Sequence, residues 1–159
     1  MRDLKWIVVH HSASPRITSF STVEEWHRKP PPKGHGWPTI GYARFIDHTG
    51  SIYDGAKRQG VQYHARRYNK NGLGICVAGD NTNPAREWNV SQHEALAQEI
   101  MYWSDLFPLA RVVGHRELPG AKTLCPGLDL EEWLDDRKIV VATLDWTDAR
   151  IAEVFGRGA

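Results

Sequence analysis

Three short apolar runs, rich in β-branched side chains, constrain the fold of this chain more than any other feature. They cover residues 4–9, 73–78 and 110–113. Runs of this length favour buried strands over helices. Ahead of the third run, apolar side chains recur every three or four residues from Leu96 to Phe107, which predicts an amphipathic helix over about 92–106. Strands that alternate with helices predict an α/β or α+β fold.

The remaining segments predict a single domain with a central mixed sheet flanked by helices. The further expected elements are strands at 40–47 and 51–54 joined by a turn at 48–50, a helix beginning within 22–27 and a last core helix over 128–137. Ser21 or Thr22 is the expected N-cap of the first helix, and Ser91-Gln-His-Glu94 matches a capping box for the helix over 92–106. We expect the core domain at 1–138. Residues 139–159 would then be a C-terminal extension, with room for a further strand and helix.

The charge balance gives no electrostatic case for a nucleic-acid or anionic-membrane partner. The 159 residues carry a formal net charge of +1, and the one basic cluster, Arg66-Arg67 with Lys70, is short. No run of 18 apolar residues predicts a transmembrane helix, and residues 1–7 lack the features of a secretory signal. We therefore expect a monomer that is made in the cytoplasm, with no nucleic acid and no membrane among its partners.

Candidate metal ligands follow two of the predicted strands. His10 comes directly after the run 4–9, and His115 follows the run 110–113 by one glycine. Ligand sites gather outside strand ends in open sheets, so the two imidazoles would share one rim if these strands are neighbours. Cys125 lies ten residues beyond His115 in a turn-rich loop, which is long enough to bring a thiolate beside them.

Two His and one Cys suit a single zinc ion, and three protein ligands leave a fourth position for water. Zinc lowers the pKa of such a water to ~7 and polarises a carbonyl, so this ligand set favours hydrolysis of an amide or ester. The spacing alone leaves the ordinary interpretation open, because eight His residues make chance groupings easy. Cys76 lies inside an apolar run and is interpreted as a small buried side chain.

Six short blocks occur in an order that is specific in combination. They are Ile7-Val-Val-His-His-Ser-Ala-Ser14, Ile40-Gly-Tyr42, His64-Ala65 with Tyr68-Asn69, Leu73-Gly-Ile-Cys-Val-Ala-Gly79, Val113-Gly-His-Arg-Glu117 and Thr123-Leu-Cys-Pro-Gly127. In these blocks the chain resembles the peptidoglycan-recognition and type-2 N-acetylmuramoyl-L-alanine amidase family, which includes small phage amidase endolysins. The resemblance covers about Trp6 to Trp133 and implies a mixed sheet flanked by helices, with a zinc cleft at one face.

The resemblance also implies the members of the site. The family's ligands map onto His10, His115 and Cys125. His11 is the alternative to His10, because successive side chains of a strand point to opposite faces. The family's active-site tyrosine maps onto Tyr42, whose hydroxyl could hold the attacking water or bind the tetrahedral intermediate.

A second catalytic helper, Lys or Thr in different members, maps onto Thr123, with Lys122 beside it as the alternative. His64 is expected to line the cleft and bind substrate. Glu117 could orient an imidazole or be a solvated turn residue. The chain departs from the family at Ala43, where many members carry His, and in its Pro-rich segment 30–38.

The implied function is hydrolysis of the amide bond between N-acetylmuramic acid and L-alanine in peptidoglycan, as in a phage endolysin. Such a protein would stay in the host cytoplasm until lysis and then act in the periplasm on the cell wall. The alternatives are a cytoplasmic amidase that recycles anhydro-muropeptides and a non-catalytic peptidoglycan-binding module. Non-catalytic members typically lack the cysteine, so Cys125 favours the enzyme. A small phage member also binds RNA polymerase, which leaves that partner open here.

Overall fold

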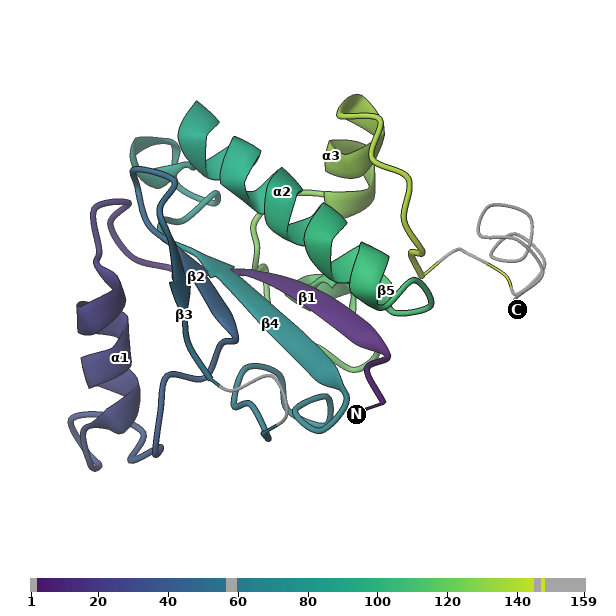
Figure 1. The fold of residues 1–159 in the computed structure, drawn as a ribbon. Coiled ribbons are helices and arrows are strands. Elements are labelled where there is room, and N and C mark those ends of the chain that lie inside the picture. The colour runs from purple at the N-terminus through teal and green to yellow at the C-terminus, as the bar shows by residue number, and fades with distance from the viewer. Residues whose placement is uncertain (1–2, 57–59, 145–146, 148–159) are drawn as a thin grey trace.

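A five-stranded mixed sheet forms the centre of the protein (Figure 1), and the computed structural model describes residues 3–56, 60–144 and 147. The strands are β1 (Trp6–His11), β2 (Arg44–Ile46), β3 (Ile52–Asp54), β4 (Gly72–Val77) and β5 (Arg111–Gly114). Their order is β3-β2-β4-β1-β5, and only β3 runs antiparallel to its neighbour. The predicted mixed sheet is confirmed.

Helices cover both faces of this sheet. They are α1 (Phe20–Arg28), α2 (Val90–Leu106) and α3 (Leu130–Asp136), with 3-10 turns η1 (Pro84–Arg86) and η2 (His115–Glu117). Helices α2 and α3 lie over one face in Figure 1, where Leu96, Ile100 and Leu130 pack into the largest apolar core. Helix α1 packs against the opposite face through Val23, which joins a smaller cluster with Phe45. The predicted arrangement of a sheet flanked by helices is therefore confirmed.

The N-caps of α1 and α2 differ from the predicted ones. Ser19 caps α1, because its hydroxyl accepts a hydrogen bond from the Thr22 backbone N–H at 3.2 Å, so Ser21 or Thr22 as the cap was wrong. Asn89 and Gln92 form the capping box of α2, two residues before the predicted Ser91–Glu94 pair. Buried Gln92 also donates to the Ala78 carbonyl at 2.7 Å, which ties the start of α2 to the end of β4.

The strand predicted over 40–47 is shorter in the structure. Only Arg44–Ile46 forms β2, because the backbone N–H of Gly41 donates to the His27 ring rather than to a neighbouring strand. Tyr42 consequently lies in an irregular segment immediately before β2.

The first residues of the predicted C-terminal extension pack onto the domain. The Val112 N–H donates to the Ala142 carbonyl at 2.7 Å, and Val141 and Ala142 are buried. Ile139 contacts the main core. The helix predicted beyond this point lies outside the described residues, and the boundary at 138 stays a prediction.

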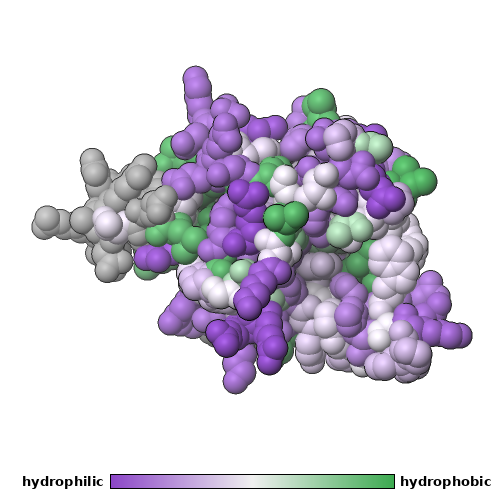
Figure 2. Space-filling model, turned by 180° about the vertical axis from the view of Figure 1, so that it is seen from behind, coloured by the Kyte–Doolittle hydropathy of each residue, from purple (hydrophilic) through white to green (hydrophobic). Residues whose placement is uncertain are grey.

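The surface mixes polar and apolar side chains. Figure 2 views the molecule from the side opposite to Figure 1 and shows a largely hydrophilic face with apolar residues scattered among polar ones. Within the part of the chain that the structure describes, no helix combines the length and the apolar character needed to cross a bilayer.

A partly buried ion pair joins α2 to the sheet and provides a test of this packing. The Glu99 carboxylate accepts from the Arg44 Nε at 3.0 Å and from the Trp103 indole N–H at 2.8 Å. Glu99→Ala would leave both donors without this acceptor, so we expect the free energy of unfolding to fall by about 3 kcal/mol. Urea denaturation measures the loss. Glu94→Ala, at an exposed position of the same helix, is the matched control and should change stability by less than about 0.5 kcal/mol. Equal effects of the two substitutions would contradict this account.

Candidate metal centre

The pairing of β1 with β5 brings two imidazoles together. The strands are parallel, and Val9 is paired with Gly114, so His10 within β1 and His115, the first residue after β5, emerge at the same rim. The ring centroids of His10 and His115 lie 4.6 Å apart. The sequence prediction required β1 and the strand before His115 to be neighbours, and the sheet order confirms that they are.

Cys125 reaches the same point on a loop that is fixed by hydrogen bonds. The Arg116 N–H donates to the Cys125 carbonyl at 2.7 Å, and the Asn81 side-chain amide donates to the Pro126 carbonyl at 2.9 Å. The Cys125 Sγ lies 3.6 Å from the His10 Nδ1. One nitrogen of each histidine and the sulfur all lie within 4.8 Å of one another, so His10, His115 and Cys125 could hold one metal ion.

The chemistry of these donors fits a metal that accepts nitrogen and sulfur. Burial lowers the pKa of both His10 and His115, so each ring is neutral near pH 7 and keeps a lone pair for a metal. Burial raises the pKa of the Cys125 thiol to about 12, so metal binding would have to displace its proton. The His11 backbone N–H, 3.3 Å from the Cys125 Sγ, is in place to donate to the resulting thiolate.

His11, the alternative ligand, turns away from the group. Its Nδ1 lies 3.5 Å from an Asp80 carboxylate oxygen, on the other side of β1 from His10. The structure thus brings His10, and not His11, together with His115 and Cys125.

Two of the predicted site residues lie against the His10 ring. The Tyr42 ring centroid is 5.1 Å from that of His10. Burial, together with the neighbouring Cys76 and Cys125, raises the pKa of Tyr42 well above 10, so its hydroxyl keeps its proton. The His64 Nδ1 lies 2.9 Å from the His10 Nε2. The predicted substrate contact of His64 stays a prediction.

The two candidate helpers lie next to the cysteine in different settings. The half-buried Thr123 accepts a hydrogen bond from the Cys125 N–H at 3.1 Å, whereas Lys122 is exposed. Glu117, predicted to orient an imidazole or to be solvated, accepts from the backbone N–H groups of Gly114 and Leu130 at 2.8 and 3.3 Å. It therefore fixes the turn that carries His115 through the backbone.

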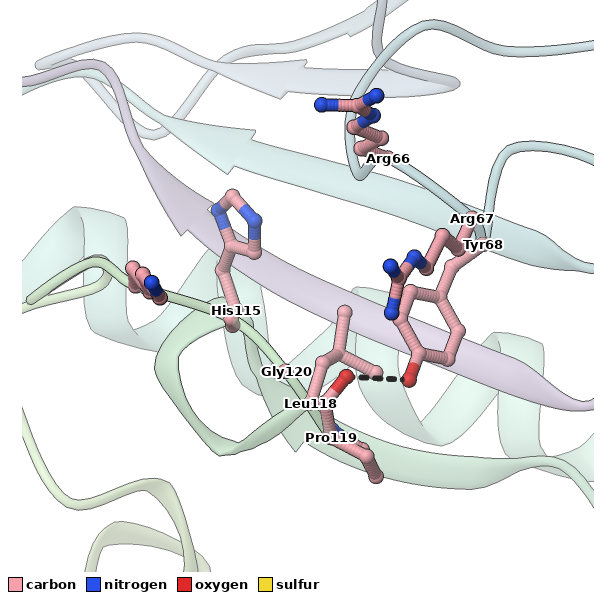
Figure 3. A pocket seen from close by; sticks show the side chains of 9 residues that line it. Arg66, Arg67, Tyr68, His115, Leu118, Pro119 and Gly120 are labelled. Atoms are coloured by element: carbon pink, nitrogen blue, oxygen red, sulfur yellow. Dashed lines mark hydrogen bonds between the residues drawn. The ribbon is translucent and has the colours of Figure 1, made fainter.

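A pocket of about 460 Å³ opens beside His115. Figure 3 shows His115 at one end and Arg67 with Tyr68 at the other, where the Tyr68 hydroxyl donates to the Pro119 carbonyl at 2.8 Å. Arg66 and Lys122 also line it. The basic pair at 66–67 is visible in the sequence. It could not be assigned to a pocket from the sequence, because the pocket also needs the loop 118–122, and only the structure places that loop opposite the pair.

Comparison with known proteins agrees with this geometry. The model of the N-acetylmuramoyl-L-alanine amidase family (Amidase_2) matches residues 1–128. The chain belongs to this family. It is 25% identical to an endolysin of Klebsiella phage KP32 over 146 residues, which cover 89% of this chain and 92% of the endolysin.

Two solved structures extend the comparison within this amidase family. The Ph2119 endolysin, from bacteriophage Ph2119 of Thermus scotoductus MAT2119, is 29% identical with a TM-score of 0.72, and the match covers 83% of each chain. The complex of peptidoglycan recognition proteins LCa and LCx bound to tracheal cytotoxin contains a chain that is 26% identical with a TM-score of 0.67. That match covers 85% of this chain and 82% of the other. The resemblance to amidases and recognition proteins is confirmed.

The two cysteines offer a matched test of the metal centre. After dialysis against zinc and removal of the excess, we expect the wild-type protein to retain one ion per chain, measured by elemental analysis. Cys125→Ala should lose the ion, because only two imidazoles remain. Cys76→Ala removes the other buried thiol and should retain the ion. Loss of the ion from both variants, or from neither, would contradict the assignment of Cys125 as a ligand.

Proposed function

We propose that the protein is a zinc-dependent amidase that hydrolyses the bond between N-acetylmuramic acid and L-alanine in bacterial peptidoglycan. The observation that carries the proposal is the group of His10, His115 and Cys125 within a member of the amidase family. When bound, zinc supplies Lewis-acid chemistry, since it acidifies water and polarises a carbonyl. Two neutral imidazoles and one thiolate are a ligand set that leaves a position open for this chemistry.

Tyr42 and Thr123 are the groups of the chain that would act on the reacting carbonyl oxygen. Tyr42 stays protonated and so can donate a hydrogen bond to an oxygen that gains negative charge. The Thr123 oxygen already accepts from the Cys125 N–H, which leaves its hydroxyl proton for a second partner. Lys122 is the alternative to Thr123 and would contribute a positive charge from the rim of the pocket.

The pocket beside His115 is suited to the peptide part of the substrate. Arg66, Arg67 and Lys122 give its lining a positive charge, which favours a peptide that carries carboxylates. A relative of the same fold belongs to a complex described as bound to tracheal cytotoxin, and this supports ligand binding by a protein of this fold. The substrate would then lie with its scissile carbonyl at His10 and His115 and its peptide directed toward Arg67.

The biological setting that we propose is host lysis by a phage. The endolysin relatives support it. The protein would remain in the host cytoplasm until lysis and then reach the wall from the periplasmic side. RNA polymerase as a further partner and the monomeric state stay predictions.

The bond that is cleaved provides the test of this function. Incubation of purified sacculi with the protein and zinc should release peptides with a free L-alanine amine and leave N-acetylmuramic acid with a free lactyl carboxylate. Mass spectrometry of the products identifies both ends. His115→Ala should release neither. Binding of sacculi without new ends would favour the non-catalytic module, and cleavage of soluble anhydro-muropeptides alone would favour the recycling amidase.

Tyr42→Phe separates catalysis from metal binding. Removal of one hydrogen-bond donor to the reacting oxygen should lower kcat on sacculi by about 10²-fold. The zinc content should not change, because the tyrosine is not among the three ligands. A variant that loses its zinc would show that Tyr42 supports the metal centre instead, and one with wild-type kcat would remove the proposed role.

A further inference from the structure

His64 packs flat against β4 in a slot that two glycines leave open. A methyl group added to Gly74 would lie 2.7 Å from the His64 Cγ, and one added to Gly72 would lie 3.2 Å from its Nε2. The two glycines are two residues apart in the strand, so both open the same face. Any larger residue at Gly74 would displace the ring. His64 is only 8% exposed, which is unusual for a residue that serves solely as a surface contact.

Hydrogen bonds hold the loop that carries His64 both before and after this residue in the chain. The Asn69 side-chain oxygen accepts from the backbone N–H groups of His64 and Ala65 at 3.0 and 2.9 Å. Two residues before His64, the buried Gln62 accepts from the Gly74 N–H at 2.9 Å. These bonds hold the loop against the strand that carries the glycine slot.

The slot points the His64 ring at one atom of a proposed metal ligand. In the parallel pairing of β1 with β4, Val8 is opposite Gly74, and His10 is opposite Cys76, so His10 and the slot share one face of the sheet. The His64 Nδ1 lies 2.9 Å from the His10 Nε2, and the two rings are nearly perpendicular at 89°. The other nitrogen of His10, Nδ1, faces the Cys125 sulfur at 3.6 Å.

These two distances indicate which nitrogen of His10 would bind the metal and which would carry the proton. The nitrogen that faces Cys125 and would bind the metal must present a lone pair and therefore carries no proton. The proton of the neutral ring then lies on Nε2, and the only arrangement that makes a hydrogen bond has His10 donating to His64. A metal-binding imidazole usually donates its outer N–H to an acceptor that fixes its tautomer and its orientation.

We infer that His64 is a positioning residue, which accepts the His10 Nε2 proton and so holds the His10 Nδ1 toward the metal. The inference rests on the proposed metal centre and goes beyond it, since it assigns to the Gly72–Gly74 slot and to His64 the task of preparing one ligand. An imidazole acceptor carries no charge, in contrast to a carboxylate in the same place. With zinc bound, the centre would therefore keep the full net positive charge of the ion with one thiolate, which would favour polarisation of the substrate carbonyl.

Two substitutions of similar size test this role. In His64→Asn the side-chain oxygen takes the position of Nδ1 and can still accept the proton, whereas His64→Leu offers no acceptor. Zinc affinity is measured by competition with a chromophoric chelator, and the His10 ring by long-range ¹H–¹⁵N correlation spectra of the zinc-loaded protein. We expect His64→Leu to bind zinc 10- to 100-fold more weakly than the wild type and to lose the hydrogen-bonded, slowly exchanging Nε2–H signal of His10, although the proton itself stays on that nitrogen. His64→Asn should retain both.

Gly74→Ala provides the same test from the other side of the contact. Its methyl group would push the His64 ring from the slot, so the zinc affinity should fall as in His64→Leu although no ligand and no histidine is changed. If Gly74→Ala does not fold, the two His64 variants are sufficient to test the inference.

Wild-type zinc affinity and an unchanged Nε2 signal in His64→Leu would overturn the inference while the proposed amidase stands. Equal losses in His64→Asn and His64→Leu would also overturn it, since shape and not the acceptor would then be responsible. A wild-type protein that binds no zinc would overturn both.

Discussion

The parallel pairing of β1 with β5 is the contact on which the rest of the site depends. Its register sets Val9 opposite Gly114, and a shift by one residue would turn one of the following histidines to the other face of the sheet. The register is fixed because Ile7, Val9 and Val112 must face the core under α2 and α3. The burial of apolar side chains on one face thus determines where polar side chains emerge on the other.

The cysteine depends on a different kind of constraint. The loop before Cys125 has no regular structure, so separate hydrogen bonds hold it: Arg116 to the Cys125 carbonyl, and Asn81 to the Pro126 carbonyl. Glu117 closes the η2 turn at the start of the same loop. These bonds bring a sulfur from outside the sheet to 3.6 Å from a strand residue. The ligand group is thereby built from two strand ends and one loop that is held in place by hydrogen bonds.

Around this group, burial sets the protonation of the side chains. It disfavours charge on the imidazoles, on the Cys125 thiol and on Tyr42, so each is neutral before a metal binds. Positive charge collects instead at the rim, where Arg66, Arg67 and Lys122 border the pocket. A buried, neutral interior beside a cationic opening is consistent with the proposed binding of a metal ion and of an acidic peptide next to it.

The sequence by itself determined the main elements and the family. Apolar runs are sufficient for β1, β4 and β5, because these strands are buried on both faces, and apolar periodicity is sufficient for α2, which buries one face. The order of short blocks is sufficient for the amidase family and its three candidate ligands. It placed the caps of α1 and α2 wrongly, since several Ser, Thr and Asn residues near a helix start can each act as a cap. Only the tertiary structure decided that His10 and not His11 joins the group, that Arg67 faces His115, and that His64 lies on Gly74. The reason is physical: these relations depend on strand register and on the packing of loops that are distant along the chain, and neither is encoded in any local pattern.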